Sequence, residues 1–207
     1  MRRIAGIAIS AVLLIAAATA QSSPPQGPHW QITDSETLWT GRYSNCQYGY
    51  YFLLPTGVVA HGEHSPAPHH GFLVKLPEVG TNTQVVSDNS ERLVWVNGEY
   101  NVTEQTTLSG FADEEIDITA TDRTQFKVTE RHSTTLDGRP AIEFKAEYER
   151  PRGRVIEEVL VALHADVAYE LGLKTTPEHY AEDRRVFEQL IAGFRFTRIP
   201  KGQCFND

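Results

Sequence analysis

Hydrophobic and polar residues alternate through much of the second half of the chain, with the two-residue period of a β-strand. In the segment 140–150, Ile142, Phe144, Ala146 and Tyr148 alternate with glutamates and a lysine. Successive side chains of a strand point to opposite faces of its sheet. We therefore expect one face of this strand to be buried and the other to be solvated.

Further strands are predicted where apolar runs are bounded by turn residues. The complete set of predicted strands is 47–54, 71–76, 92–96, 125–135, 140–150, 155–163, 167–175 and 194–199. The segment 155–163 is apolar almost throughout, so it is expected at the centre of the sheet. Asn97-Gly98, Leu136-Asp137-Gly138-Arg139 and His164-Ala165-Asp166 are predicted turns between strands, and these short connections indicate antiparallel pairing.

One amphipathic helix is predicted near the end of the chain. Thr176 suits the N-cap, Pro177 suits the first helical position, and Gly193 is expected to end the helix. Its apolar stripe comprises Tyr180, Phe187, Leu190, Ile191 and Phe194. The segment 109–122 has apolar spacings that fit either a strand or a helix. Antiparallel strands with a helix packed on their sheet predict an α+β domain.

The N-terminal residues have the pattern of a secretory signal peptide. A basic start, Met1-Arg2-Arg3, precedes an apolar run that ends in Ala18-Thr19-Ala20, which predicts cleavage before Gln21. The run is shorter than the ~20 residues that span a bilayer, so stable membrane insertion after cleavage is not expected. We predict a signal peptide at 1–20, a flexible Pro-rich leader at 21–40 and a single domain at 41–207, secreted or periplasmic.

The acidic composition narrows the classes of partner. The chain carries 19 Lys and Arg against 27 Asp and Glu, a formal net charge of −8. An acidic surface repels phosphate backbones, so nucleic acid is an unfavourable partner. A protein or a small molecule is the expected partner, and the oligomeric state is left open.

The two cysteines, Cys46 and Cys204, are an even number in a chain expected in an oxidising compartment. This pattern predicts a disulfide between them. Two unpaired thiols are the alternative.

A histidine-rich loop at 56–71 is the clearest candidate for metal chemistry. Its imidazoles belong to His61, His64, His69 and His70. Imidazole is a common ligand of Zn and Cu, so one hypothesis is a transition-metal site on this loop. The alternative is a polar connection that contains histidines without binding a metal.

Catalytic signatures are missing from the sequence. It contains neither the Gly-x-Ser-x-Gly of hydrolases nor a phosphate-binding loop. The acidic group Asp113, Glu114, Glu115 and Asp117 is expected to be an exposed turn. The aromatic residues between Tyr43 and Phe52 are expected in the sheet core rather than in a ligand cleft.

Several local strings resemble the PsbP-like (Mog1/PsbP) family. They are Tyr43-Ser44-Asn45 with Gly49-Tyr50-Tyr51-Phe52 and Leu54-Pro55, the hairpin from Thr135 to Ala141, and Tyr169-Glu170-Leu171-Gly172-Leu173 with the following Tyr180, Asp183, Phe187 and Phe194-Arg195. The resemblance implies an α/β sandwich, a central antiparallel sheet with helices packed on its faces, and favours a helix in part of 109–122. It also implies an adaptor rather than an enzyme.

These observations together predict a secreted or periplasmic, non-enzymatic binding or accessory domain. Two alternatives remain: a periplasmic metal-binding protein that uses the His61–His70 loop, and a hydrolase whose active site is assembled from residues far apart in the sequence.

Overall fold

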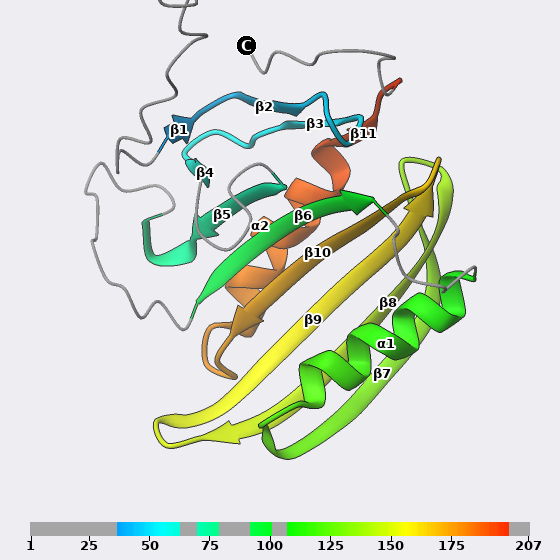
Figure 1. Ribbon diagram of the computed structural model, residues 1–207. Helices are drawn as coiled ribbons and strands as arrows, with labels where there is room; N and C mark the ends of the chain where they lie inside the picture. Colours follow the sequence, from blue (N-terminus) through cyan, green and yellow to red (C-terminus); the bar gives the residue numbers. More distant parts are fainter. Residues whose placement is uncertain (1–36, 63–69, 79–91, 101–106, 199–207) are drawn as a thin grey trace, which may run out of the picture. The chain divides into compact units, whose positions relative to one another are not determined.

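The computed structural model describes residues 37–62, 70–78, 92–100 and 107–198 (Figure 1). The elements in chain order are β1 (Thr37–Trp39), β2 (Arg42–Asn45), β3 (Tyr50–Leu53), β4 (Ala60–Gly62), β5 (Gly71–Lys75), a short 3-10 helix (Leu76–Glu78), β6 (Leu93–Tyr100), α1 (Leu108–Ala120), β7 (Thr124–Leu136), β8 (Arg139–Arg150), β9 (Gly153–His164), β10 (Val167–Thr175), α2 (Tyr180–Gly193) and β11 (Phe194–Phe196). The predicted α+β class with antiparallel strands is confirmed.

An eight-stranded antiparallel sheet forms the body of the domain, in the order β1-β4-β5-β6-β10-β9-β8-β7. The apolar strand β9 lies inside this order, as its sequence predicts. Two-residue turns join β7 to β8 and β9 to β10. Asp137, Gly138, Ala165 and Asp166 have φ between 45° and 73°, the backbone that such hairpin turns require.

The two helices pack on opposite faces of this sheet. Alternate residues of β9 belong to two different hydrophobic clusters: Leu160 and Ala162 pack with α2, whereas Val159 and Val161 pack with α1. α1 contacts β8 and β9, and α2 contacts β10. The ambiguous segment 109–122 is therefore helical, as the family resemblance implies.

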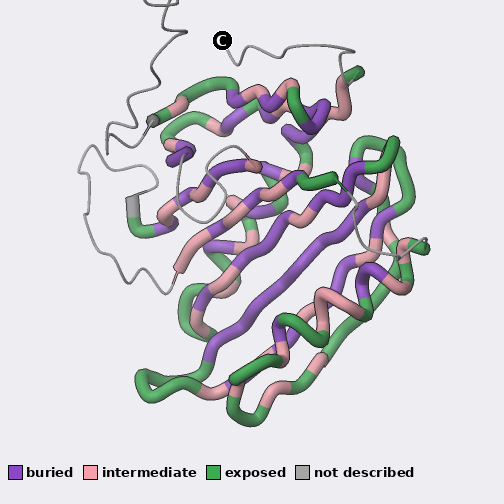
Figure 2. Tube along the Cα trace, viewed as in Figure 1, coloured by how far each residue is buried: buried purple, intermediate pink, exposed green. Residues whose placement is uncertain are grey.

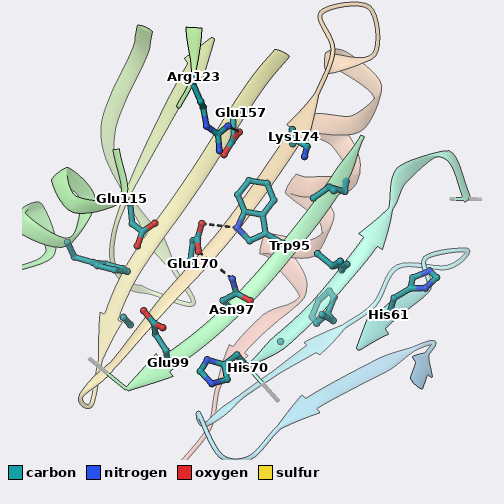
Figure 3. Close-up of a pocket in the computed structure, with 16 residues that line it drawn as sticks. His61, His70, Trp95, Asn97, Glu99, Glu115, Arg123, Glu157, Glu170 and Lys174 are labelled. Carbon is teal, nitrogen blue, oxygen red and sulfur yellow. Dashed lines mark hydrogen bonds and ion pairs between the residues drawn. The ribbon is translucent and has the colours of Figure 1, made fainter. Parts of the chain in front are cut away.

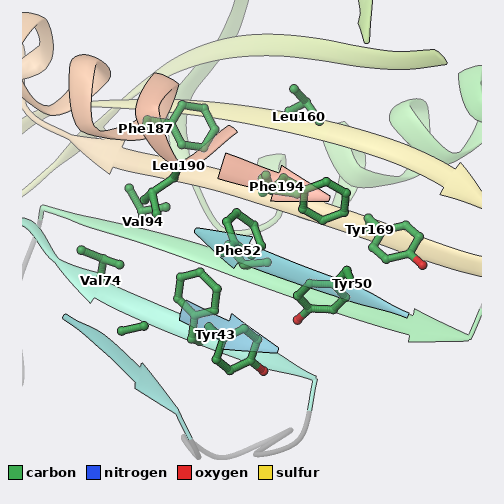
Figure 4. Close-up of a cluster of buried hydrophobic side chains, with 14 of the residues drawn as sticks. Tyr43, Tyr50, Phe52, Val74, Val94, Leu160, Tyr169, Phe187, Leu190 and Phe194 are labelled. Carbon is green, nitrogen blue, oxygen red and sulfur yellow. The ribbon is translucent and has the colours of Figure 1, made fainter. Parts of the chain in front are cut away.

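A three-stranded sheet, β11-β3-β2, lies on the same face as α2. Its aromatic side chains pack with those of the large sheet to form the main core (Figure 4). Figure 2 shows the buried positions along the strands of both sheets. Tyr43, Tyr48, Tyr50 and Phe52 are at most 4% exposed. The prediction that these aromatic residues belong to the core is confirmed, and Tyr51, half-buried, lies at its edge.

Asn97-Gly98 is not a turn, contrary to the prediction. β6 runs straight through it to Tyr100. A Cβ on Gly98 would lie 3.0 Å from the Tyr48 Cβ and 3.0 Å from a carbon of the Tyr50 ring. The glycine therefore makes room for aromatic side chains that are distant in the sequence, which a local turn rule does not detect.

Further element boundaries also differ from the prediction, and β11 ends at Phe196 rather than at residue 199. Residues 46–49 form a turn, so the aromatic strand begins at Tyr50. The segment after Thr176-Pro177 makes a turn, in which the His179 N–H donates to the Thr176 carbonyl, and α2 begins only at Tyr180. β1 lies within the range 21–40 that the sequence assigns to the leader, because it pairs with β4.

Several predictions concern residues outside the described ranges. These are the signal peptide at 1–20, the leader up to residue 36, His64, His69 and Cys204. Within the described ranges, no helix has the length and apolar character needed to cross a membrane.

The disulfide between Cys46 and Cys204 also stays a prediction. Cys46 lies in the turn between β2 and β3, and the Thr197 N–H donates to the Gly49 carbonyl of the same turn at 2.8 Å. Thr197, seven residues before Cys204 in the sequence, therefore lies beside the turn that contains Cys46.

Candidate functional site

A cleft of about 510 Å³ lies on the face of the large sheet that carries α1. α1 covers β8 and β9, and the neighbouring strands β10, β6 and β5 contribute most of the cleft (Figure 3). Its lining residues are His61, His70, Gly71, Phe72, Leu73, Leu93, Trp95, Asn97, Glu99, Phe111, Glu115, Arg123, Glu157, Ala168, Glu170 and Lys174. The size of this cleft and its mixture of polar and apolar lining residues are typical of a small-molecule site.

The indole of Trp95 forms an aromatic surface in this cleft. Trp95 on β6 is paired with Gly172 on β10. A Cβ on Gly172 would lie only 1.9 Å from Cζ2 of the indole, so the ring rests against the bare glycine backbone. Gly172 thus lets Trp95 lie close to the sheet while the side chain also lines the cleft.

Glu170 holds this indole in place. Its Oε1 accepts a hydrogen bond of 2.8 Å from Trp95 Nε1, and its Oε2 accepts one of 3.5 Å from Asn97 Nδ2 (Figure 3). Asn97 is the residue opposite Glu170 in the β6–β10 pairing. The register of two strands therefore builds a fixed polar group next to a fixed aromatic ring.

Three carboxyl groups, those of Glu99, Glu115 and Glu170, gather at one end of the cleft (Figure 3). Burial raises the pKa of the Glu115 carboxyl to about 8, and the negative charges of Glu170 and Glu99 contribute to this rise. Burial also raises the pKa of Glu170, against the hydrogen bonds from Trp95 and Asn97 that lower it. Perturbed carboxyl groups in a cleft are characteristic of functional sites.

The other end of the cleft contains two basic residues. Arg123 makes an ion pair with the buried carboxylate of Glu157, and this carboxylate also accepts a hydrogen bond of 2.8 Å from the Tyr148 hydroxyl. Lys174 lies on β10, four residues beyond Glu170. At about 3.3 Å per strand residue, the two positions are about 13 Å apart along the strand. The cleft therefore has an acidic end and a separate, partly neutralised end.

His70 borders the acidic end and is fixed by two tyrosines. Its Nε2 lies 2.9 Å from the Tyr48 hydroxyl, and its carbonyl accepts a hydrogen bond of 2.7 Å from the Tyr50 hydroxyl. The half-exposed ring of Tyr100 packs on Tyr48 at a centroid distance of 5.3 Å. This arrangement anchors the end of the histidine-rich segment to the core.

The structure describes two of the four histidines in the predicted metal site. His61 lies in β4 and is 1% exposed, so it belongs to a strand rather than to the predicted loop. Figure 3 shows the imidazoles of His61 and His70 apart from one another, although both line the cleft. Within 37–62, 70–78, 92–100 and 107–198, no group of three or more potential ligand side chains is arranged to hold a metal ion. A Zn or Cu site that includes His64 and His69 stays a prediction.

The acidic group in the segment 113–117 is not an exposed turn, contrary to the prediction. It lies on α1, where Asp113 and Asp117 are exposed and Glu114 and Glu115 are half-buried. Sequence reasoning therefore missed the functional candidate Glu115, and it did not single out Trp95, Asn97 or Glu170. The sequence signals that could have indicated the cleft were polar residues and a glycine at positions within strands whose neighbours are apolar.

Replacing Glu115 by glutamine is expected to stabilise the protein increasingly as the pH rises. An ordinary glutamate has a pKa of about 4.5, so between this pH and about 8 the folded state binds more protons than the unfolded state. Wild-type stability therefore falls across this interval, whereas the glutamine variant lacks this loss. With solvent screening considered, we expect a gain of about 1–2 kcal/mol at pH 8.

Urea denaturation of both proteins at pH 5 and pH 8 measures this difference. Asp117→Asn, an exposed acid on the same helix, is the control and is expected to show a smaller change. A Glu115→Gln variant that is less stable than wild type at pH 8 would show that the carboxylate has a stabilising partner.

Comparison with solved structures identifies the fold as PsbP/Mog1-like. Neither a protein-family model nor a curated protein matches the sequence. The solution structure of the cyanobacterial PsbP protein CyanoP from Synechocystis sp. PCC 6803 matches with a TM-score of 0.53 and 14% identity, over 84% of this chain and 99% of that chain. LpqN, involved in cell envelope biogenesis of Mycobacterium tuberculosis, matches with a TM-score of 0.50 and 14% identity, over 83% of this chain and 100% of that chain. The Ran-binding protein Mog1p of Saccharomyces cerevisiae matches with a TM-score of 0.46 and 9% identity, over 78% and 95% of the chains.

Proposed function

We propose that this protein is a secreted or periplasmic, non-catalytic domain that binds a small molecule in the cleft between α1 and strands β5, β6 and β10. The observation that carries the proposal is the fixed surface formed by Trp95, Asn97 and Glu170. A site that is rigid before the ligand arrives loses little entropy on binding. The predicted signal peptide supports the compartment, and the similarity to LpqN, which is described as involved in cell envelope biogenesis, agrees with it.

The chemistry of the cleft favours binding over covalent catalysis. The described lining residues include no serine, threonine or cysteine. Glu170 is engaged by Trp95 and Asn97, and Glu157 is engaged by Arg123 and Tyr148. These partners orient the cleft wall, whereas a hydroxyl or thiol nucleophile would need an activating base beside it.

A hydrolase is the second candidate, and Glu115 is the observation that favours it. A carboxyl group with a pKa of about 8 remains protonated at neutral pH, and general acids of glycosidases share this property. The carboxyl groups of Glu99 and Glu170 line the same cleft and would be the candidates for a second carboxylate. Turnover of nitrophenyl glycosides that is lost in Glu115→Gln would establish this function instead.

The binding proposal is tested by nuclear magnetic resonance with a library of small metabolites. The indole N–H of Trp95 is a direct probe, because it lies in the cleft and can be assigned by its loss in Trp95→Phe. We expect binders to shift this resonance together with the amides of β6, β10 and α1. Binders that shift only residues on the α2 face, or a library without any binder at the cleft, would contradict the proposal.

A further inference from the structure

We infer that the ligand of this cleft is an organic cation, with an ammonium or guanidinium group attached to a flat apolar group. The cation would lie among Glu99, Glu115 and Glu170, and the apolar group would lie on Trp95. This inference rests on the proposed binding function and adds the chemical class of the ligand to it.

The charge distribution of the cleft favours a cationic ligand over an anionic one. Glu99 on β6, Glu115 on α1 and Glu170 on β10 come from three different elements and point their carboxyl groups toward one end of the cleft (Figure 3). The guanidinium of Arg123 is engaged with Glu157 at the other end. Lys174 is about 13 Å away from Glu170 along β10. An anionic ligand would be repelled at the acidic end, whereas a cation there would offset the repulsion between the carboxylates.

The fixed indole of Trp95 provides a surface for the flat apolar group of the ligand. Trp95 rests on Gly172 and donates its N–H to Glu170, so the position of its ring is set by both sides of the β6–β10 pair. An aromatic face held in this way attracts flat apolar groups and cations. Because the hydrogen bond directs the indole edge toward Glu170, a ligand that covers the ring brings an attached cation close to this carboxylate.

A cation that binds at the acidic end is expected to release the proton of Glu115. The acidic groups that act on Glu115 are Glu170 of β10, Glu99 of β6 and Glu114 of its own helix. The imidazole of His70, 2.9 Å from the Tyr48 hydroxyl, borders the same end of the cleft. Nearby on the elements packed against α1, Arg131 of β7 is engaged with Asp113. A bound cation favours the ionised form of Glu115 and would displace its proton. Affinity for a cation should therefore rise between pH 6 and pH 8, and a neutral ligand should show no such rise.

Phenethylamine and 2-phenylethanol form the probe pair, since they differ only in an ammonium group against a hydroxyl. We expect the amine to shift the Trp95 indole N–H resonance at pH 8 and to bind about tenfold more tightly than the alcohol. Amine affinity should increase about fivefold from pH 6 to pH 8, and calorimetry in buffers of different ionisation enthalpy should detect proton release.

Two variants test the carboxylates separately from the fold. Glu115→Gln and Glu99→Gln should each weaken amine binding about fivefold and leave the affinity for the alcohol unchanged. Asp117→Asn, on the exposed face of α1, should change neither. Intact folding of each variant is verified by the remaining indole and amide resonances.

The possible outcomes distinguish failure of the cationic ligand class from failure of the binding function itself. Equal affinity of the amine and the alcohol at Trp95 would overturn the cationic ligand and leave the binding function in place. No shift of the Trp95 resonance by the amine would also overturn the cationic ligand, and the metabolite library would then decide the binding function. Amine binding that is unaffected by either glutamine substitution would show that these carboxylates do not hold the cation.

Discussion

Replacing Phe194 by alanine is expected to lower the free energy of unfolding by about 3–5 kcal/mol. Phe194 is fully buried and begins β11, where it is paired with Phe52 of β3. Its ring lies 4.7 Å from that of Phe196 and 5.1 Å from that of Phe52, measured between centroids. The substitution would leave a cavity at the point where α2, the small sheet and the large sheet meet (Figure 4). The measurement is the urea midpoint, with the slope of the transition unchanged.

Leu53→Ala is the matched control for this substitution. Leu53 follows Phe52 on β3, and 52% of its surface is exposed, so we expect a change below about 0.5 kcal/mol. If Phe194→Ala destabilised the protein no more than Leu53→Ala, the aromatic cluster would not be the centre of the core.

Replacing Asp183 by alanine is expected to destabilise the protein by about 3–5 kcal/mol. Asp183 is 1% exposed in the first turn of α2, and its Oδ2 accepts a hydrogen bond of 2.8 Å from Arg92 Nε. The Thr175 hydroxyl also donates to this carboxylate. The alanine variant would leave the Arg92 side chain, 18% exposed, without its main counter-charge. α2 would also lose its polar contacts with Arg92, next to the start of β6, and with Thr175 at the end of β10.

Glu182→Ala separates this effect from the loss of any acidic residue at the helix start. Glu182 precedes Asp183, is 75% exposed and has a carboxylate oxygen 4.0 Å from Arg92 Nη2. We expect a loss of at most about 0.5 kcal/mol, because an exposed ion pair contributes little. Similar unfolding midpoints for the two variants would contradict a buried anchor at Asp183.

The strands could be predicted from sequence because their signals are local. The alternation in 140–150 and the continuous apolar run in 155–163 state which faces are buried, and Asp137-Gly138 has the backbone freedom that its hairpin needs. Asn97-Gly98 is an equally strong turn signal in the sequence, but it lies within the strand β6. The side chains that require a glycine there, Tyr48 and Tyr50, are about fifty positions away, so no local pattern could reveal them.

The cleft could not be predicted because its parts come from separate elements. Glu115 and Glu170 are distant in the sequence, and each has an ordinary explanation by itself, as a polar residue on a helix or as a polar residue that alternates with apolar ones along a strand. The β6–β10 pairing places Asn97 opposite Glu170 and Trp95 opposite Gly172, and only this register creates the site. A glycine, a glutamate and a lysine among the apolar residues of β10 were a detectable sign.

The core and the cleft are connected through the same strands. β6 and β10 direct Val94, Val96 and Leu171 toward α2 and the small sheet, and direct Trp95 and Glu170 toward the cleft. Because the core residues fix the spacing of the two strands, they also fix the position of the indole relative to the carboxylates. Loss of core packing should therefore weaken ligand binding even when the lining residues are unchanged.

A crystal structure of the protein with phenethylamine would show directly whether the cleft holds a cation beside the Trp95 indole. We expect the phenyl ring to lie against the Trp95 indole, with the ammonium nitrogen within hydrogen-bond distance of Glu115, Glu99 or Glu170. An amine that binds only on another face of the protein, with the surface formed by Trp95, Asn97 and Glu170 left to solvent, would contradict it.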